Sequence, residues 1–202
     1  MHNWRGFFFP EKTNIIDGYH WTPTSEAFYK TIKRFVGMTD RILEFGSATG
    51  HISYRLAKEG YSVTLIDVRN DSIETAREIF KKNKVKGNFY CTDILNHNAR
   101  CDLAWNSGLV QCFNDSDKSR LIAKLAHITN RILLFYPDVD NPAKQIGTNQ
   151  EAIPGVGNAR EYGIKRIPEI VYKYFGEIYQ GRIDARTIKV KFDMYWLYAE
   201  NK

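Results

Sequence analysis

The chain has 202 residues, of which 43% are hydrophobic and 26% charged, and it carries a net charge of +6. This size and composition are typical of a globular protein with one sizeable core, so we predict a single main domain. No apolar run approaches the roughly 18 residues that a membrane helix needs. The charge is weaker than the dense basic patch of a dedicated nucleic-acid-binding protein, although it tolerates an anionic partner.

Residues 1–38 are rich in aromatic side chains and are predicted to form an arm ahead of the main domain at residues 39–202. The apolar stretch near the start is too short for a signal peptide, so we expect a cytoplasmic protein. Thr22 and Pro23 favour the start of a helix, and Gly37 favours its end. The apolar residues of this helix predict that it packs on a sheet, whereas the residues before it lack periodicity and would suit a lid.

From residue 41 onward, β-branched and apolar runs alternate with amphipathic stretches of helical period. Gly60 ends the first of these helices, Asp71 with Glu74 resembles a capping box for the second, and Ser116 is a candidate cap for the third. Strands separated by such helices form βαβ units in a parallel sheet with helices on both faces. The five predicted strands of this doubly wound region lie at residues 41–46, 61–67, 87–93, 101–108 and 131–137.

The end of the chain follows a different pattern. After a loop at residues 138–163, residues 167–175 are predicted to be helical. Two runs of strand-like alternation then follow, at residues 177–183 and 187–199, with no helix between them. Strands joined by so short a connection pair antiparallel. We therefore predict an α/β fold with a mostly parallel, seven-stranded sheet that ends in an antiparallel hairpin.

The three cysteines are Cys91, Cys101 and Cys112. Their odd number and the lack of C-x-x-C spacing argue against a disulfide framework and against a zinc site. We predict reduced, mostly packed thiols, and no bound metal.

The stretch LEFGSATG, residues 43–50, ends the first predicted strand and leads into the next helix. In open α/β sheets, ligands bind outside the carboxyl ends of the strands. Glycines at such a point let the backbone approach a ligand, and the first turn of the helix offers free N–H groups. Gly46 and Gly50 therefore mark a candidate cofactor loop, although a tight turn alone would be the plainer explanation.

Two acidic residues follow at later strand ends. Asp67 closes the second strand about 20 residues downstream, where an acid accepts hydrogen bonds from a ribose diol. Asp93 ends the third strand and would suit the amino group of adenine. Helix capping for Asp67 and a simple turn for Asp93 are the alternatives. Together with the glycine loop, the two acids predict a site for an adenosine-containing cofactor.

The spacing of the loop favours one class of cofactor. A dinucleotide loop needs G-x-G-x-x-G to hold a pyrophosphate, whereas Gly46 and Gly50 stand four residues apart. Glu44, two residues before the first glycine, would repel a pyrophosphate but suits the ammonium and sulfonium groups of S-adenosylmethionine. We therefore predict S-adenosylmethionine rather than a nicotinamide dinucleotide.

In these motifs, and in the final pair of antiparallel strands, the chain resembles the class I, Rossmann-like S-adenosylmethionine-dependent methyltransferases over roughly residues 39–201. The resemblance implies an enzyme that converts S-adenosylmethionine to S-adenosylhomocysteine. It also implies the roles of the site residues. Gly46, Ser47 and Gly50 would line the methionine end, Val68 would lie under the adenine and Ile94 at its edge, and Asn106 would hold the ammonium, often through a backbone carbonyl.

Methyl transfer from a sulfonium is an in-line displacement, so the protein has to align donor and acceptor and exclude water. An acceptor hydroxyl or ammonium also needs a base, most often histidine. Of the five histidines, His20 is our candidate for this catalytic role, because Tyr19 and Trp21 flank it just before a helix. Packing of the aromatic arm is the alternative. His51 would either touch the cofactor or face solvent.

The sequence indicates the methyl acceptor less directly than the cofactor. Family members that methylate exocyclic amines of nucleic acids, or glutamine amides, typically carry Asn/Asp-Pro-Pro-aromatic after the fourth strand, whereas this chain has Asn106-Ser107-Gly108-Leu109. The aromatic arm with Tyr19 and Trp21, and a long loop with Arg160, would suit a small acidic or aromatic acceptor.

We therefore predict a methyltransferase that acts on a small molecule. An RNA or protein methyltransferase is the first alternative, and it predicts binding to polyanions that depends steeply on salt. A protein that binds S-adenosylmethionine without catalysis is the second, because no catalytic base is evident.

Overall fold

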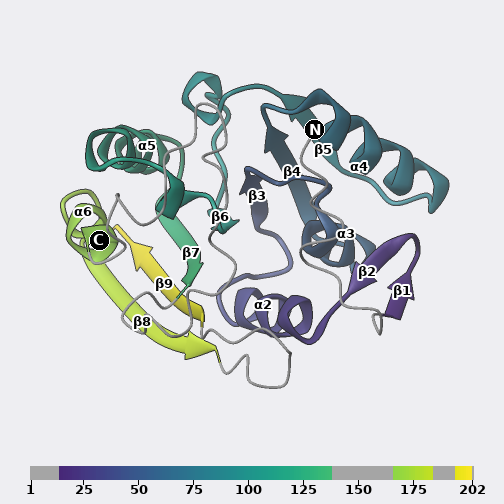
Figure 1. Ribbon diagram of the computed structural model, residues 1–202, viewed down its shortest axis with the longest axis horizontal. Helices are drawn as coiled ribbons and strands as arrows, with labels where there is room; N and C mark the ends of the chain where they lie inside the picture. The colour runs from purple at the N-terminus through teal and green to yellow at the C-terminus, as the bar shows by residue number, and fades with distance from the viewer. Residues whose placement is uncertain (1–13, 138–165, 184–193, 202) are drawn as a thin grey trace, which may run out of the picture.

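The computed structural model describes residues 14–137, 166–183 and 194–201. Seven strands form one sheet in the order β5-β4-β3-β6-β7-β9-β8 (Figure 1). The first five strands in this order are parallel, and β9 runs antiparallel to both β7 and β8. The predicted mostly parallel sheet with an antiparallel end is confirmed. The strands are β3 (Arg41–Phe45), β4 (Ser62–Asp67), β5 (Asn88–Cys91), β6 (Leu103–Ser107), β7 (Arg131–Pro137), β8 (Glu177–Ile183) and β9 (Met194–Glu200).

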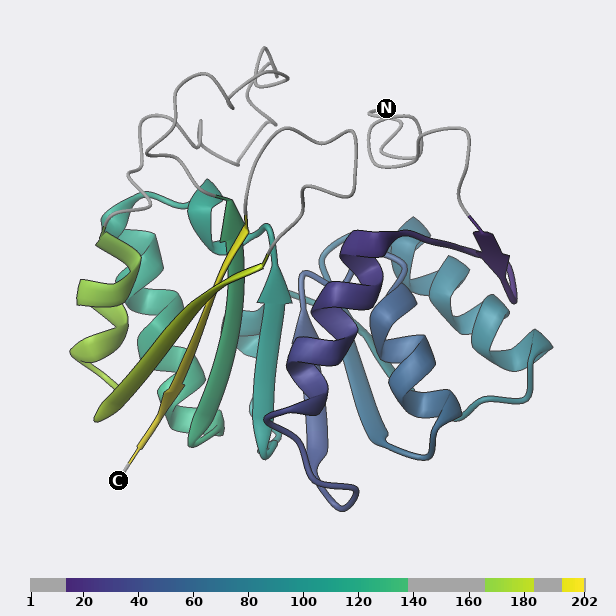
Figure 2. The same cartoon turned by 90° about the horizontal axis from the view of Figure 1, so that it is seen from below.

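The helices divide between two hydrophobic clusters on opposite faces of the sheet (Figures 1 and 2). Side chains alternate between the two faces along each strand. Thus Ile42 of β3 belongs to one cluster, and Leu43 and Phe45 belong to the other. The first cluster includes α2 (Pro23–Lys33), α3 (His51–Lys58) and α4 (Asn70–Lys82). The second includes α5 (Asp115–Ile128), α6 (Ile167–Tyr172) and parts of the short 3-10 helices η1 (Ile94–Asn96) and η2 (Val110–Cys112).

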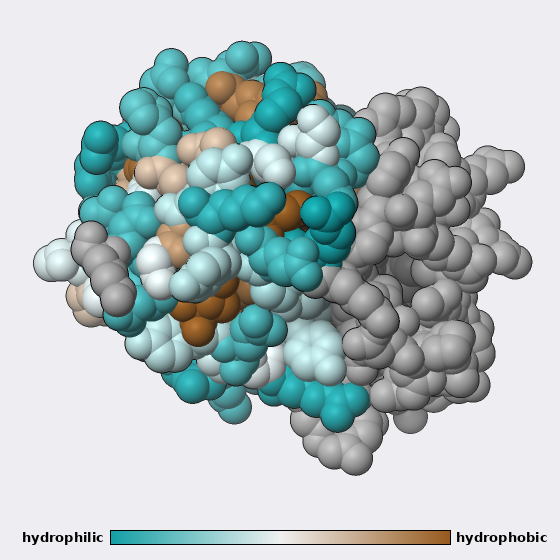
Figure 3. Space-filling view, turned by 90° about the vertical axis from the view of Figure 1, so that its left-hand side faces the viewer, coloured by the Kyte–Doolittle hydropathy of each residue, from teal (hydrophilic) through white to brown (hydrophobic). Residues whose placement is uncertain are grey.

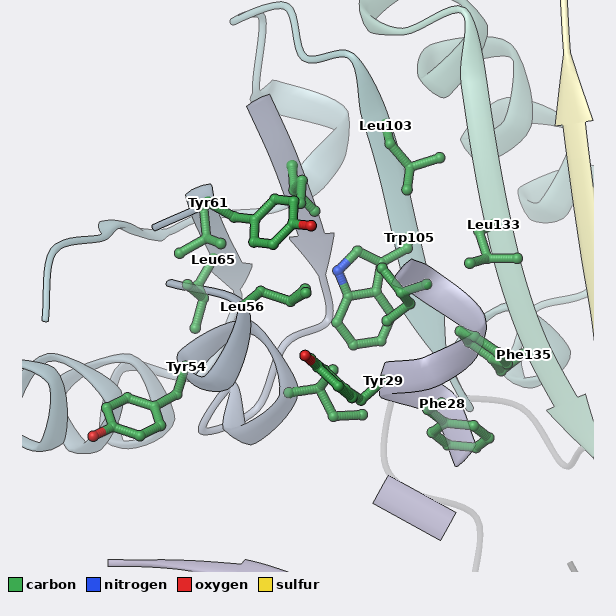
Figure 4. Close-up of a cluster of buried hydrophobic side chains, with 14 of the residues drawn as sticks. Phe28, Tyr29, Tyr54, Leu56, Tyr61, Leu65, Leu103, Trp105, Leu133 and Phe135 are labelled. Carbon is green, nitrogen blue, oxygen red and sulfur yellow. The ribbon is translucent and has the colours of Figure 1, made fainter. Parts of the chain in front are cut away.

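Helix α2 packs directly on the sheet, as its apolar stripe predicts. Phe28 stacks on Phe135 of β7 with their ring centroids 4.5 Å apart, close to the fully buried Trp105 (Figure 4). The helix starts where the sequence predicts, because Thr22 caps it in a capping box with Ser25 and a proline follows the cap. It ends at Lys33, before the predicted Gly37.

A small antiparallel hairpin precedes α2, made of β1 (Asn14–Ile16) and β2 (Tyr19–Trp21). Asp17 and Gly18 form its turn, with φ of 53° and 96°. Positive φ at both central residues is typical of the tight hairpin turns that Asp-Gly favours. No periodicity in the sequence marks these two short strands, but the Asp-Gly pair is a local signal for the turn. The division of the chain at residue 38 stays a prediction.

The predicted starts of α4 and α5 were each wrong by two residues. Helix α4 begins at Asn70 after Arg69, and Asp71 pairs with Arg69 at 2.6 Å instead of capping the helix. Helix α5 is capped by Asn114, whose side chain accepts a hydrogen bond from the Asp117 amide at 2.8 Å, so Ser116 lies inside the helix. Both helices therefore begin before the residue that the sequence suggests as their cap.

On the side of α5 and α6, hydrophilic residues surround a few separate apolar patches (Figure 3). Scattered apolar residues of this kind are normal on a solvent-facing surface. Among the described helices, none is long and apolar enough to cross a membrane. The three cysteines all lie in the described ranges and are free; Cys101 is buried and Cys91 exposed.

Candidate functional site

The glycine loop leaves the carboxyl end of β3 and turns tightly against β4. Gly46 and Gly50 have φ of +61° and +66°, a conformation that side chains disfavour. A Cβ atom at Gly50 would lie 1.9 Å from a methyl carbon of Leu65, and one at Gly46 would lie 2.6 Å from a methyl carbon of Leu109. The amide of Ser47 donates to the carbonyl of Ile66 at 3.0 Å. The loop therefore needs glycine at both positions to reach this conformation.

Glu44 lies beneath this loop. Its side chain is 6% exposed, and its Oε2 atom has no hydrogen-bond partner among the described residues. Oε2 lies 3.8 Å from the position of a Cβ at Gly50. Burial, with a smaller contribution from the charge of Asp67, raises the pKa of Glu44 to about 8. A buried carboxyl with an unpaired oxygen is costly unless a positive or donating group comes to it.

Asp67 ends β4 and ties the glycine loop to that strand. Its Oδ2 accepts a hydrogen bond from the amide of Ala48 at 2.8 Å, and its Oδ1 accepts one from the amide of Arg69 at 2.9 Å. A carboxylate has about four acceptor positions, so both oxygens keep the capacity for further donors. The next residue, Val68, is 68% exposed although it is apolar. An acceptor group and an uncovered apolar side chain thus stand side by side.

Asp93 and Ile94 lie just beyond the end of β5. Asp93 caps η1, because its Oδ1 accepts a hydrogen bond from the amide of Leu95 at 2.9 Å. The helix-capping or turn role of this residue is therefore present, and its other oxygen is left over for a ligand. Ile94 is buried in the second hydrophobic cluster.

Asn106 lies near the end of β6 and is 1% exposed. Its side-chain amide donates to the carbonyl of Phe45 at 2.5 Å, and its oxygen accepts from the amide of Leu109 at 2.8 Å. The side chain thus joins the end of β3 to the loop after β6, and it lies 3.3 Å from the position of a Cβ at Gly46. The role implied through its backbone carbonyl stays a prediction.

These residues meet at one edge of the sheet because β5, β4, β3 and β6 are consecutive neighbours. The strand order reverses between β3 and β6, since successive strands lie to one side of β3 and later strands to the other. Such a switch point leaves a crevice outside the carboxyl ends, where open α/β sheets bind ligands. The sequence therefore predicts correctly that the glycine loop and the acidic strand ends lie together.

The residues predicted from the N-terminal arm and the long loop are less fully described. The backbone of His20 lies in β2 opposite Ile15, but its side chain lies outside the described part of the structure, as does Arg160 altogether. Trp21 donates from Nε1 to Glu26 at 3.0 Å, and the guanidinium of Arg55 lies 4.7 Å from the centre of its ring. An acceptor-binding role for these residues stays a prediction.

Two contacts near the glycine loop were not anticipated. The hydroxyl of Tyr19 donates to the backbone carbonyl of Thr49 at 2.6 Å. On the other side of Gly50, Nε2 of His51 lies 3.1 Å from Oγ of Ser25. Withdrawal of the His51 ring from water lowers its pKa to about 4. These contacts join segments about 30 residues apart, so no local pattern in the sequence announces them.

A family model described as a methyltransferase domain matches residues 42–131. The match runs from β3 to the start of β7, so it includes the glycine loop, the three strand-end acids and Asn106. This match, together with the fold, supports a class I S-adenosylmethionine-dependent methyltransferase. A search of curated protein sequences finds no match.

Several solved structures share the fold of this chain. The magnesium protoporphyrin IX methyltransferase ChlM from Synechocystis PCC 6803 with bound SAH aligns with a TM-score of 0.73 and 15% identity, over 98% of this chain and 93% of that chain. The PH0226 protein from Pyrococcus horikoshii OT3 aligns over the whole of both chains, with a TM-score of 0.75 and 14% identity. The N-methyltransferase NodS from Bradyrhizobium japonicum WM9 aligns over 90% of this chain and 98% of that chain, with a TM-score of 0.65 and 13% identity.

Proposed function

We propose that this methyltransferase transfers a methyl group from S-adenosylmethionine to a small-molecule acceptor. One observation carries the cofactor part of the proposal. A buried carboxyl with an unpaired oxygen, an acid with spare acceptor capacity and an exposed apolar residue lie at adjacent strand ends. These groups fit the ammonium, ribose diol and adenine of one molecule. The cofactor supplies an electrophilic methyl group on a sulfonium.

In this proposal the residues of the chain bind, orient and exclude water. Glu44 offers its unpaired oxygen to a positive group, and ionises more readily once that group is present. Asp67 accepts hydrogen bonds from the ribose while it keeps the Ala48 amide, and Val68 covers one face of the adenine. The other groups proposed to contact the cofactor are Gly46, Ser47, Gly50, Asp93, Ile94 and Asn106.

The acceptor part rests on different support. ChlM is named as a magnesium protoporphyrin IX methyltransferase and NodS as an N-methyltransferase, so this fold accommodates acceptors other than nucleic acids. The stretch from Asn106 to Leu109 lacks the Pro-Pro-aromatic motif typical of enzymes that methylate base amines or amides. We retain His20 as the proposed base, and Tyr19, Trp21 and Arg160 as proposed acceptor residues. A cytoplasmic location also stays a prediction.

The first test is a calorimetric titration with S-adenosylmethionine, S-adenosylhomocysteine and, as a control, NAD. We expect micromolar binding of the first two and none of NAD. Asp67→Ala should weaken S-adenosylmethionine binding at least tenfold, because it removes the ribose acceptor and the link to Ala48. Asp71→Ala is the matched control, since Asp71 is exposed and its carboxylate contacts Arg69 and the amide of Ser72, away from the glycine loop. Wild-type protein that is folded and free of ligand yet does not bind would refute the cofactor assignment.

The second test separates the classes of acceptor. Transfer of a labelled methyl group is measured to small aromatic and acidic compounds, to RNA and to protein extracts. Transfer to small molecules supports the proposal. Transfer to RNA or protein, with binding that weakens steeply as salt is raised, would replace it with the macromolecular alternative. Tight cofactor binding without transfer to any of these would indicate a non-catalytic binding protein.

A further inference from the structure

The glycine loop receives a hydrogen bond from a distant part of the chain. Tyr19 lies in β2 and is 5% exposed. Its hydroxyl donates a hydrogen bond to the backbone carbonyl oxygen of Thr49, at an O–O distance of 2.6 Å. Its ring also packs against Tyr54 of α3, with the ring centroids 5.1 Å apart. Thr49 stands directly before Gly50, the residue with the least room for a side chain. The hairpin therefore holds the loop at its most constrained point.

A second contact holds the other side of Gly50. His51 is the first residue of α3, and its Nε2 lies 3.1 Å from Oγ of Ser25 in α2. Ser25 is itself fixed in the capping box, where its Oγ lies 2.9 Å from Oγ1 of Thr22. His51 is neutral near pH 7 because its pKa is low, so it keeps one acceptor and one donor nitrogen for this contact. Residues from β2 and α2 thus bracket Gly50.

The hairpin is anchored independently of the loop. The carboxylate of Asp17 accepts hydrogen bonds from the hydroxyl of Tyr54 at 2.8 Å and from the ammonium of Lys58 at 2.5 Å. The carbonyl of Asp17 accepts one from the side chain of Asn83 at 3.2 Å. These partners lie in α3 and at the end of α4. The turn of the hairpin is therefore fixed to two helices, and Tyr19 reaches the loop from a firm support.

We infer that β1, β2 and the start of α2 form a clamp that holds the glycine loop in its cofactor-binding conformation, with Tyr19 as its positioning residue. A loop with two glycines has many conformations to lose, and fixing each residue costs about 1–2 kcal/mol. A loop ordered before binding spares the ligand that cost. This inference rests on the proposed function for its effect on affinity, but the ordering of the loop is testable without ligand.

Tyr19→Phe removes only the hydroxyl that reaches Thr49. We expect its affinity for S-adenosylmethionine to fall about 2- to 13-fold, the range that corresponds to one lost hydrogen bond. Tyr29→Phe is the matched control, because Tyr29 lies in α2 and also donates its hydroxyl, but to Glu59 beyond the far end of α3. It should retain wild-type affinity within twofold. Titrations are made at a temperature where melting curves show all three proteins folded.

Equal affinity of Tyr19→Phe and wild type would overturn the inference, and so would an equal loss in both variants. Hydrogen exchange of the ligand-free proteins gives a second readout. Amides of residues 46–54 should exchange faster in Tyr19→Phe than in wild type and Tyr29→Phe. If wild type does not bind S-adenosylmethionine, the proposed function fails, and exchange alone decides whether the clamp orders the loop. Unchanged exchange in Tyr19→Phe would then reject the clamp.

Discussion

Two halves of the sheet, an acidic half made of β3, β4 and β5 and a second half that starts with β6 and β7, end differently at the edge where the site lies. Strands β3, β4 and β5 carry Glu44, Asp67 and Asp93 within two residues of their carboxyl ends, whereas β6 ends among uncharged residues and the acid after β7, Asp138, lies outside the described residues. In the acidic half Asp67 ties the loop to β4 and Asp93 caps η1, whereas Glu44 keeps an unpaired oxygen beneath the loop. The acidic half therefore carries chemistry specific enough to indicate a cofactor class. The second half does not specify the acceptor in the same way.

The largest effect is expected from a substitution in the glycine loop, which follows β3 in the acidic half of the sheet. Gly50→Ala places a methyl group 1.9 Å from Leu65 in a backbone conformation that alanine disfavours. We expect a loss of stability of about 2–4 kcal/mol and no measurable binding of S-adenosylmethionine. Gly60→Ala is the control, because Gly60 also has positive φ, but the nearest atom to its Cβ position is a methyl carbon of Met38 at an ordinary 3.6 Å. Melting curves and calorimetry measure both effects, and similar losses in the two variants would contradict the steric explanation.

A smaller effect on stability is expected at Asn106, whose side chain joins the end of β3 to the loop after β6. Asn106→Ala leaves the buried carbonyl of Phe45 and the amide of Leu109 without their partners. Such groups cost about 1–3 kcal/mol each when left unpaired, so we expect a comparable loss in the free energy of unfolding. Chemical denaturation measures it. Asn96→Ala, in η1 and exposed, should change stability by less than about 0.5 kcal/mol. If Asn106→Ala were equally mild, the proposed link between β3 and the loop after β6 would carry little energy.

The most diagnostic effect concerns Glu44, because it depends on pH. Its pKa of about 8 in the folded protein lies above the ordinary value of 4.5, so the folded state binds the extra proton between these values. Stability from this group is therefore complete below pH 4.5 and is lost as pH rises toward 8 and beyond. Glu44→Gln should remove this loss, so the variant should gain stability relative to wild type as pH rises from 5 to 8.5.

Cofactor affinity should change in the opposite direction. The ionised form of Glu44 attracts a positive group, so the affinity of wild type for S-adenosylmethionine should increase between pH 6 and 8.5. Glu44→Gln should lack this increase. Calorimetry across this range, with thermal melts at each pH, tests both statements. Parallel pH profiles for wild type and variant would show that Glu44 does not titrate as described.

The sequence predicted the sheet, and that the glycine loop and the acidic strand ends meet at one edge, because both depend on local patterns. Alternating strands and helices fix a parallel sheet, and parallel strands bring Glu44, Asp67 and Asp93 to one edge. Helix starts were less accurate at Asp71 and Ser116, because several neighbouring polar residues compete for each cap. The Asp17-Gly18 turn was readable but was overlooked. The contact of Tyr19 with Thr49 was not readable, because it depends on how the hairpin packs against α3.

The strand order also has a consequence for how the protein is made. Residues 14–96 contain the hairpin, α2 and the three neighbouring strands β3, β4 and β5 with their helices. N-terminal parts of a chain emerge first from the ribosome. The contacts of Tyr19 with Thr49 and of Ser25 with His51 are thus able to form before β6 has been synthesised, whereas α2 completes its packing only when β7 supplies Phe135. Until β6 arrives, β3 presents an unpaired edge, which makes this interval of synthesis the most exposed to misassembly.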